Sequence, residues 1–421
     1  MLWTHAVMYV IAYFGLFMTL FFLLGYSHSR DTKDPKPKRF PFVSIIITAF
    51  NEEKAILNSV KSVLQLDYPK DKYEIIVVDD GSTDRTFEKV SEFAEKYGNV
   101  RVFKKKNGGA ASAKNLGIKK AKGELITTLD ADSFVAKDAL KKMIGYFDED
   151  PKIGGVTTSL NVHNPRGFLQ NLQWAEYMAG IFLRKVFSKV DAVVVLPGPF
   201  SLYRKSFFDK YGGFEEGNIT EDTEMGMRMQ AHGYKIRNSM SASVYTITPN
   251  NFRALTIQRI RWYYGFVRNS VRYKRLFNVR KYGDLAAIIL PSAFVSVILS
   301  VLASLLFFRS SFLSLQAGMN KIGALGMSGF SSLFRMKWQF IWDNIVAYAT
   351  NPFIFFIAIG LIFSITWLVL AQKGSGEKRS MKFAFFCFLF TYGFFYAFWW
   401  LITFIYRGIL RKKIKWGPRY Y

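Results

Sequence analysis

Long stretches without any charge alternate with charged stretches along the chain. Four stretches contain no Lys, Arg, Asp or Glu: Ala6–Ser27, Leu285–Phe308, Ile345–Ala371 and Phe383–Tyr406. Each reaches the roughly 18–20 residues that a helix needs to cross the apolar core of a bilayer. The pattern therefore predicts an integral membrane protein and excludes a soluble, secreted or fibrous one. The first stretch lacks a basic start and a small-residue cleavage pattern, so we interpret it as a retained anchor and not as a signal peptide.

Short apolar runs alternate with helical segments between the first two charge-free stretches. Phe42–Phe50, Tyr73–Val78, Val100–Phe103 and Glu124–Leu129 have the composition of buried strands, and a helix is expected to start within Asn107–Gly117. A repeated strand-then-helix order predicts a mostly parallel sheet flanked by helices. Ligands of such sheets bind beyond the carboxyl ends of the strands. The acidic clusters of this chain follow those ends, which points to one site.

The helical segments beyond residue 160 are amphipathic. Phe168–Phe187 and Asn251–Tyr273 combine an aromatic and aliphatic face with interleaved arginines, as expected of helices at a membrane interface. An ordinary amphipathic helix packed on the domain core remains the alternative. We divide the chain into four parts: an N-terminal transmembrane anchor (1–29), a cytosolic catalytic domain (30–250), an interfacial helix (251–282) and a C-terminal transmembrane region with about three spans (283–421).

The charge is strongly basic, with 57 Lys+Arg against 31 Asp+Glu and a formal net charge of +26. The basic residues gather beside the apolar stretches, as in Lys33–Arg39 and Arg268–Lys281, and such clusters mark the cytoplasmic side and attract anionic lipids. We therefore expect a multi-pass protein of the cell membrane, with residues 30–282 in the cytosol and no nucleic acid as a partner. Three C-terminal spans would place the basic C-terminus outside, against this rule, unless residues 310–345 include an interfacial helix or a re-entrant turn.

Asp130-Ala131-Asp132 offers two carboxylates at a strand end. Such hard oxygen ligands suit Mg²⁺ or Mn²⁺ bound together with substrate phosphates. The alternative is a turn cap, since Asp-x-Asp is common by chance. The single cysteine, Cys387, excludes a disulfide framework and a cysteine zinc site.

Asp79 and Asp80 end another strand and precede Gly81-Ser82-Thr83. A helix cap at Ser82 or Thr83 explains the small residues but leaves two adjacent carboxylates at the end of a buried strand, where a charge needs a partner. A ligand that carries N–H and O–H donors, such as a nucleoside, would supply one.

Glu221 and Asp222 follow Thr220 at the start of a predicted helix. Thr220 as a helix cap, with acids favoured by the helix dipole, is one interpretation. The other is a carboxylate general base that deprotonates an attacking hydroxyl.

Gln258-Arg259-Ile260-Arg261-Trp262 places Gln258, Arg261 and Trp262 on one helical face. Arginine suits a diphosphate and tryptophan offers a flat surface to a sugar ring, whereas an interfacial Trp with snorkelling Arg explains the composition but not the order.

The order of these motifs along the chain resembles the family-2 inverting glycosyltransferases. It is similar to their membrane-embedded branch, which includes cellulose, chitin-oligosaccharide, hyaluronan and poly-N-acetylglucosamine synthases. The resemblance covers residues 42–275 and the flanking spans. It implies an α/β GT-A fold, a Rossmann-like mixed sheet, together with transmembrane and interface helices, and a UDP-sugar donor.

The resemblance also implies a role for each site residue. Asp222 would be the catalytic base beside Glu221, and Asp132 would bind the metal with Asp130. The uridine would contact Ala49, Asn51, Glu52 and Asp80, supported by Asp79. The diphosphate and acceptor would contact Lys114, Asp130, Gln258, Arg259, Arg261 and Trp262, and Pro197–Ser201 resembles the segment beneath the acceptor sugar.

The predicted function is transfer of a sugar from a UDP-sugar to an acceptor hydroxyl at the cytosolic face, as processive synthesis of a β-linked polysaccharide. The alternative is a single addition to a membrane lipid, and a non-enzymatic scaffold is disfavoured by the intact acids. The partners would be the donor, a carbohydrate or lipid acceptor, and membrane lipids. The sugar, the product length and a homo-oligomeric state stay open.

Overall fold

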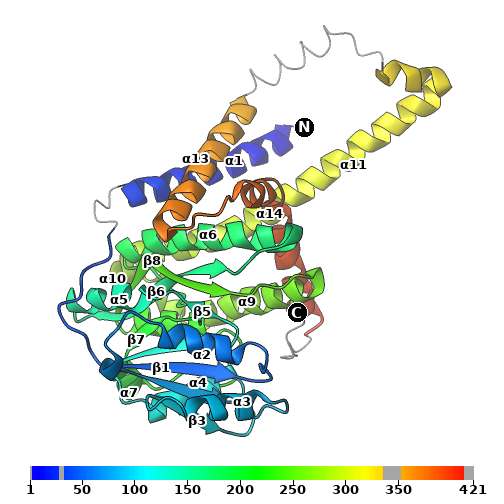
Figure 1. Ribbon diagram of the computed structural model, residues 1–421. Coiled ribbons are helices and arrows are strands. Elements are labelled where there is room, and N and C mark those ends of the chain that lie inside the picture. Colours follow the sequence, from blue (N-terminus) through cyan, green and yellow to red (C-terminus); the bar gives the residue numbers. More distant parts are fainter. Residues whose placement is uncertain (1, 28–32, 335–351, 412–421) are drawn as a thin grey trace.

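The computed structural model describes residues 2–27, 33–334 and 352–411 (Figure 1). One sheet of eight strands forms the centre of the domain, in the order β3-β2-β1-β4-β7-β6-β8-β5. Its strands are β1 (Val43–Ala49), β2 (Tyr73–Asp79), β3 (Val100–Lys104), β4 (Leu125–Asp130), β5 (Phe134–Val135), β6 (Ile153–Val162), β7 (Leu202–Arg204) and β8 (Lys235–Thr246).

Half of the sheet is parallel, as the sequence predicts, and the other half is mixed. β3, β2, β1 and β4 pair in parallel, whereas β7 is antiparallel to both β4 and β6. β6 and β8 are parallel to each other, and the short β5 is antiparallel to β8. The expected mixed α/β sheet is confirmed. The four predicted strands match β1 to β4 within about two residues, which is the usual uncertainty of strand ends read from sequence.

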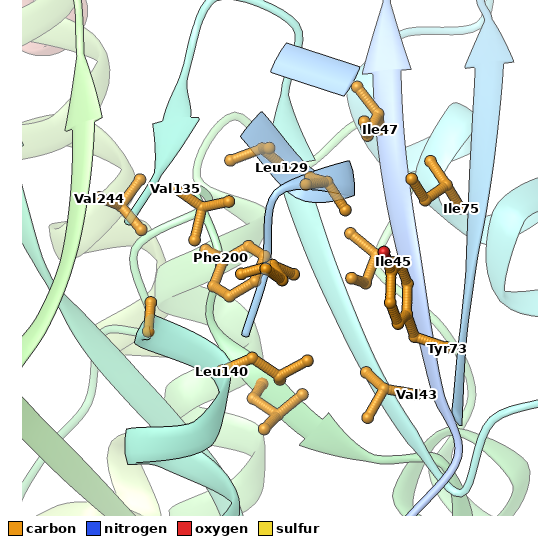
Figure 2. Close-up of a cluster of buried hydrophobic side chains, with 14 of the residues drawn as sticks. Val43, Ile45, Ile47, Tyr73, Ile75, Leu129, Val135, Leu140, Phe200 and Val244 are labelled. Atoms are coloured by element: carbon orange, nitrogen blue, oxygen red, sulfur yellow. The ribbon is translucent and has the colours of Figure 1, made fainter. Parts of the chain in front are cut away.

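Helices cover both faces of the sheet. They are α2 (Ile56–Leu64), α3 (Thr86–Ala94), α4 (Ala110–Lys120), α5 (Ala139–Ile144), α7 (Lys205–Tyr211) and α8 (Glu221–Ala231), with short 3-10 turns at Lys70–Lys72 and Gly145–Asp148. The apolar residues of β1 alternate between two cores. Val43, Ile45 and Ile47 point toward Tyr73, Leu129 and Phe200 on one side (Figure 2), and Ile46 belongs to the second core, which residues of α4 and α8 complete on the other side. Burial on both faces explains the uninterrupted apolar runs of these strands.

Two long helices form a layer between the sheet and the apolar helices. α6 (Gly167–Lys189) packs against Met18 and Leu368 of the apolar helices on one side and Val162 and Met227 of the domain on the other. α9 (Phe252–Arg272) starts at Asn251, whose side chain accepts a hydrogen bond from Ala254 N, and it ends before a 3-10 turn at Lys274–Phe277. Both predicted amphipathic helices are therefore present and contact the domain and apolar helices together.

Within the part of the chain that the structure describes, four helices are long and apolar enough to cross a membrane. These segments comprise α1 (Leu2–Ser27), α11 (Leu290–Phe334), α13 (Pro352–Ser375) and α14 (Lys382–Thr403), and α10 (Val279–Asp284) leads into α11. π-helical turns occupy Leu285–Ile289 and Phe404–Ile409. α1, α11 and α13 extend away from the sheet on the side of α6 (Figure 1). Their length and composition mark a membrane protein.

α14 follows a different path. Arg379, just before it, donates a hydrogen bond to Val162 O at the end of β6, and Arg407, just after it, lies 4.1 Å from the ring centroid of Tyr264 on α9. Between these ends, Tyr392 contacts α6 and Trp399 contacts α9. Both ends of α14 therefore lie at the domain. The expectation of about three C-terminal spans stays a prediction, but these contacts favour two.

Candidate active site

The carboxyl ends of three parallel strands bring the predicted acidic motifs to one edge of the sheet. Ala49 of β1 pairs with Asp79 of β2, and Thr48 pairs with Asp130 of β4. Asn51 and Glu52 follow the same edge directly after β1. Because strand register alone places these groups together, the site edge is a consequence of the sheet topology.

The loops after β1 and β2 hold each other by hydrogen bonds. Asn51 has a positive φ of 54°, its N donates to Ser82 Oγ at 2.9 Å, and its Oδ1 accepts from Thr83 N at 2.8 Å. The backbone N of Glu52 donates to Thr86 Oγ1 at 2.8 Å. Asparagine tolerates the left-handed region better than most residues. Ser82 and Thr83 therefore bind the β1 loop, and neither caps α3, which starts after Arg85.

Asp80 already has partners within the protein. Its carboxylate accepts hydrogen bonds from Lys105 Nζ at 2.8 Å, Gly108 N at 3.0 Å and Gly109 N at 2.7 Å. Asp80 therefore needs no ligand as the partner of its charge, contrary to the expectation from the sequence, because the loop before α4 compensates it. Asp79 differs: it is fully buried, and its Oδ1 has no hydrogen-bond partner among the residues that the structure describes. An unpartnered buried oxygen at this edge suits a donor group of a ligand.

Lys114, Glu221 and Asp222 form the charged centre of the site. Lys114 Nζ of α4 lies 2.7 Å from Glu221 Oε1 at the first residue of α8, and the lysine side chain is 3% exposed. Asp222 follows on the same helix, where its Oδ1 accepts from Thr223 N at 2.7 Å. The positive charge of Arg261 on α9 lies close enough to favour the ionised form of both carboxylates. Residues about 100 positions apart in the sequence thus meet in one cluster.

The two neighbouring carboxylates have opposite pKa shifts. Burial, and then the adjacent charge of Glu221, raise the pKa of Asp222 to about 6. Burial also opposes ionisation of Glu221, but Lys114 and Arg261 outweigh it and hold the pKa of Glu221 below its ordinary value. One carboxylate is therefore a fixed anion, and the other titrates near neutral pH. Environments that separate the pKa values of two acids are typical of acid–base catalysis.

Asp130 and Asp132 supply hard oxygen donors next to this cluster. Asp130 contributes to the electrostatic environment of Lys114, and Asp132 is 2% exposed, with Ser133 Oγ 3.2 Å from its Oδ1. Within the described residues, no group of three or more His, Cys, Asp or Glu side chains has a metal-binding arrangement. A pair of carboxylates without a complete protein cage fits Mg²⁺ or Mn²⁺ that takes its remaining ligands from water and substrate phosphates.

α9 is docked directly onto the start of α8. A Cβ on Gly265 would lie 2.2 Å from Thr220 Oγ1, so only glycine allows this close approach. Asn269 Nδ2 donates to Thr220 Oγ1 at 3.1 Å. Thr220 therefore anchors α9 and makes no side-chain cap of α8, which corrects the capping interpretation. Sequence reasoning missed Gly265 and Asn269, although a glycine within an aromatic helix was an available signal.

The side chains of the Gln258–Trp262 motif contact different parts of the protein. Arg261 acts on Glu221 and Asp222, whereas Arg259 is fully buried and pairs with Glu176 of α6 at 2.5 Å. Trp262 lies beside Arg259, and its ring centroid is 6.4 Å from that of Tyr177. Gln258 Oε1 is buried with no hydrogen-bond partner among the described residues. The predicted donor-binding role of Arg259 stays a prediction, but its contacts point away from the acidic cluster.

The Pro197–Ser201 segment closes the site beside Asp222. Leu196 N donates to Asp222 O at 3.4 Å, and Thr128 Oγ1 of β4 donates to Gly198 O at 2.9 Å. Phe200 adopts a positive φ of 61° and is fully buried in the core (Figure 2). Such strain in a bulky residue concentrates at functional sites. The segment thus lies against both the proposed base and β4.

Comparison with known proteins identifies the class of this domain. Residues 44–212 match the family model "Glycosyl transferase family 2". A mannosyltransferase from Pyrobaculum calidifontis, solved in complex with GDP-Man and Mn²⁺, shares the fold with a TM-score of 0.58 at 19% identity, covering 90% of this chain and 100% of that one. Residues 44–212 therefore match the family-2 glycosyltransferases, and the chain shares the GT-A-like fold of that mannosyltransferase, as the sequence resemblance implied.

Curated relatives extend the likeness beyond that domain. Poly-β-1,6-N-acetyl-D-glucosamine synthases of Staphylococcus aureus (strain COL) and Staphylococcus epidermidis are each 30% identical over 264 residues. The match covers 60% of this chain and 64% of each relative, so it spans slightly less than two thirds of their length. The family model ends at residue 212, before Asp222 and α9. The roles of those residues therefore depend on the geometry described above.

Proposed function

We propose that this protein is an inverting glycosyltransferase that elongates a β-linked polysaccharide from a UDP-sugar at the cytosolic face of the membrane. The observation that carries the proposal is Asp222, a buried carboxylate with a pKa raised to about 6, beside the Lys114–Glu221 ion pair and within reach of the charge of Arg261. A base poised near neutral pH next to fixed cations suits the activation of a hydroxyl group.

The chemistry is a single displacement. Asp222 accepts the proton of the acceptor hydroxyl, and the oxygen forms a bond to the anomeric carbon while the bond from that carbon to the diphosphate oxygen breaks. Glu221 stays ionised, keeps Lys114 in place and raises the basicity of Asp222. Arg261 offsets negative charge on the departing diphosphate. Attack from the face opposite the leaving group inverts the anomeric centre, so an α-linked donor yields a β-linkage.

Asp130 and Asp132 are the residues that would hold Mg²⁺ or Mn²⁺. The bound ion would offset charge on the diphosphate. The adjoining edge, with Asn51, Glu52 and Asp79, is the proposed place of the uridine. The hydrogen-bonded loops after β1 and β2 support this assignment, because a rigid surface loses little entropy when it binds a nucleotide.

The relatives support N-acetylglucosamine as the sugar and elongation as the outcome. Both relatives described above are poly-β-1,6-N-acetyl-D-glucosamine synthases. Trp262, beside the site, would border the acceptor sugar. The basic residues that flank the apolar helices support a multi-pass protein of the cell membrane with its catalytic domain in the cytosol.

The test uses the full chain in lipid nanodiscs with Mg²⁺ or Mn²⁺ and radiolabelled UDP-N-acetylglucosamine or UDP-glucose. Products are separated by size and by partition into organic solvent. We expect label from UDP-N-acetylglucosamine in a long saccharide chain that a specific glycanase degrades. Label confined to one lipid-sized species would establish a single addition to a lipid instead. Release of no UDP from either donor would contradict the proposal.

A further inference from the structure

A buried polar junction joins three helices behind Trp262. Glu176 of α6 accepts a hydrogen bond from Arg259 Nη2 of α9 at 2.5 Å through one carboxylate oxygen. Its other oxygen accepts from Tyr392 Oη of α14 at 2.9 Å. Arg259 is fully buried, so a single carboxylate is shared between an interface helix, the helix of the Gln258–Trp262 motif and an apolar helix.

The arginine of this junction packs against tryptophan rings. Its Cζ lies 4.3 Å from the ring centroid of Trp262 and 5.5 Å from that of Trp399 on α14. Its Nε and Nη1 are buried and have no hydrogen-bond partner among the residues that the structure describes. The guanidinium is therefore held in place by Glu176 at one nitrogen and by aromatic faces around the rest, an arrangement that favours cation–π attraction.

The same face of α9 contacts α14 at further aromatic pairs. Tyr263 stacks on Trp400 with centroids 4.5 Å apart and planes 6° apart, and Trp399 Nε1 donates to Thr256 Oγ1 at 3.2 Å. α14 therefore contacts α9 on both sides of Arg259 along the sequence. A shift of α14 would therefore move the Arg259 guanidinium, against which the Trp262 ring packs.

We infer that Arg259 is a positioning residue: paired with Glu176, which in turn accepts a hydrogen bond from Tyr392, it sets the orientation of Trp262 and so links α14 to the acceptor side of the active site. The inference rests on the proposed function, in which Trp262 borders the acceptor. A buried ion pair is suited to this purpose because it specifies one geometry, whereas apolar packing tolerates sliding. We expect donor binding at Asp79, Asp130 and Lys114 not to depend on the junction.

The test compares Glu176→Gln, Arg259→Lys and Tyr392→Phe with a matched control, Glu377→Gln. The control makes the same chemical change in the pair between Glu377 and Arg379, which lies before α14. Full-length protein in nanodiscs is assayed with UDP-N-acetylglucosamine and a soluble N-acetylglucosamine oligosaccharide. We expect the acceptor KM to rise about tenfold in Glu176→Gln and Arg259→Lys, while the donor Kd changes less than about twofold. Glu377→Gln should match the wild type.

A second measurement reports the position of Trp262 without relying on turnover. In protein labelled with 5-fluorotryptophan, the ¹⁹F resonance of Trp262 is assigned with Trp262→Phe. We expect it to shift in Glu176→Gln and Arg259→Lys and to stay in place in Glu377→Gln. Tyr392→Phe removes one hydrogen bond and keeps the ion pair, so it tests the junction in a protein that still folds and should give a smaller shift.

The outcomes distinguish a failure of the positioning role of Arg259 from a failure of the proposed function. An unshifted Trp262 resonance in Glu176→Gln would overturn the inference whatever the activity, and so would a shifted resonance with an unchanged acceptor KM. Wild-type protein that binds neither UDP-N-acetylglucosamine nor UDP-glucose would contradict the proposed function instead, while the resonance would still report whether Arg259 positions Trp262.

Discussion

Asp222 lies between an anion and a cation, and its proton affinity depends on both. Burial and the charge of Glu221 raise its pKa to about 6, and Lys114 opposes that rise. Because Lys114 is paired with Glu221 at 2.7 Å, it stays a cation and stabilises the Asp222 carboxylate without giving it a proton. At the residue scale, the site therefore consists of one titrating carboxylate, Asp222, beside the fixed ion pair of Lys114 and Glu221.

Replacing Asp222 by Asn should separate donor binding from transfer. The amide keeps the shape of the side chain but cannot accept the hydroxyl proton, and general-base catalysis is typically worth about 10²–10⁴-fold. We expect turnover to fall by at least about 100-fold, while the Kd for the UDP-sugar, measured by calorimetry, changes little. Turnover retained at the wild-type level would show that Asp222 is not the base.

Substitutions of Glu221 and Lys114, the two charged residues beside Asp222, should shift the acid limb of the profile of kcat against pH in opposite directions. Asp222 accepts a proton only when ionised, so kcat should rise with pH through about 6. Glu221→Gln removes a repelling anion and should lower the pKa of Asp222, which moves the limb to lower pH. Lys114→Met removes an attracting cation and should move it to higher pH. The measurement is kcat against pH at saturating donor.

A shift in the same direction in both variants would contradict the assignment, because two opposite charges cannot have the same effect on one titrating group. Asp209→Asn serves as a control, since the pair between Asp209 and Lys205 lies on the exposed surface of α7. Its profile should match the wild type.

The two successive helices α8 and α9 approach each other closely because α9 carries a glycine at the contact. α9 touches the start of α8 at Gly265, and Asn269 completes the contact with Thr220. This contact sets the distance of Arg261 from Glu221 and Asp222. The docking of α9 on α8 therefore determines where the positive charge of Arg261 lies.

Gly265→Ala should therefore damage catalysis without touching a reacting group. The new Cβ would lie 2.2 Å from Thr220 Oγ1, and overpacking of this kind costs about 1–3 kcal/mol of stability. We expect a lower melting temperature and a fall of about 100-fold in kcat/KM, as a displacement near 1 Å of positioning groups can produce. Gly393→Ala on α14 is the control, because its Cβ would meet nothing within 4 Å. Equal activity in both variants would contradict this account.

At the scale of the whole molecule, the sheet lies at one end and the apolar helices α1, α11 and α13 extend from the other (Figure 1). α1 ends at the domain, where Tyr26 packs on Phe182, and α13 ends there too, where Ser243 Oγ donates to Ser375 O. Far from the domain, Tyr9 contacts Phe353. We therefore predict crossings by α1, α11 and α13, with α14 along the interface helices.

This arrangement predicts that Arg411 lies on the same side of the membrane as the catalytic domain. In a Cys387→Ser background, single cysteines at Arg411 and at exposed Lys96 should react with an impermeant reagent only in inside-out vesicles. A cysteine at Trp3 should react only from the outside. Labelling of Arg411→Cys in intact cells, with Lys96→Cys protected, would establish a third C-terminal crossing. The predicted side also agrees with the positive-inside rule.

Local patterns alone determined much of this molecule. The strand-then-helix order and the acids after each strand predicted the parallel half of the sheet, because strand period and apolar burial are local properties. Charge-free stretches predicted the apolar helices for the same reason. The motif order pointed to the family whose model matches residues 44–212.

Tertiary structure decided what depends on contacts between distant residues. Lys105 and the backbone before α4 compensate Asp80, Thr220 anchors α9, and Glu176 holds Arg259 away from the acidic cluster. The path of α14 was equally hidden, since a helix that crosses a bilayer and one that lies along α6 and α9 have the same apolar composition. Composition reports how much apolar surface a segment buries; only packing determines whether lipid or protein covers it.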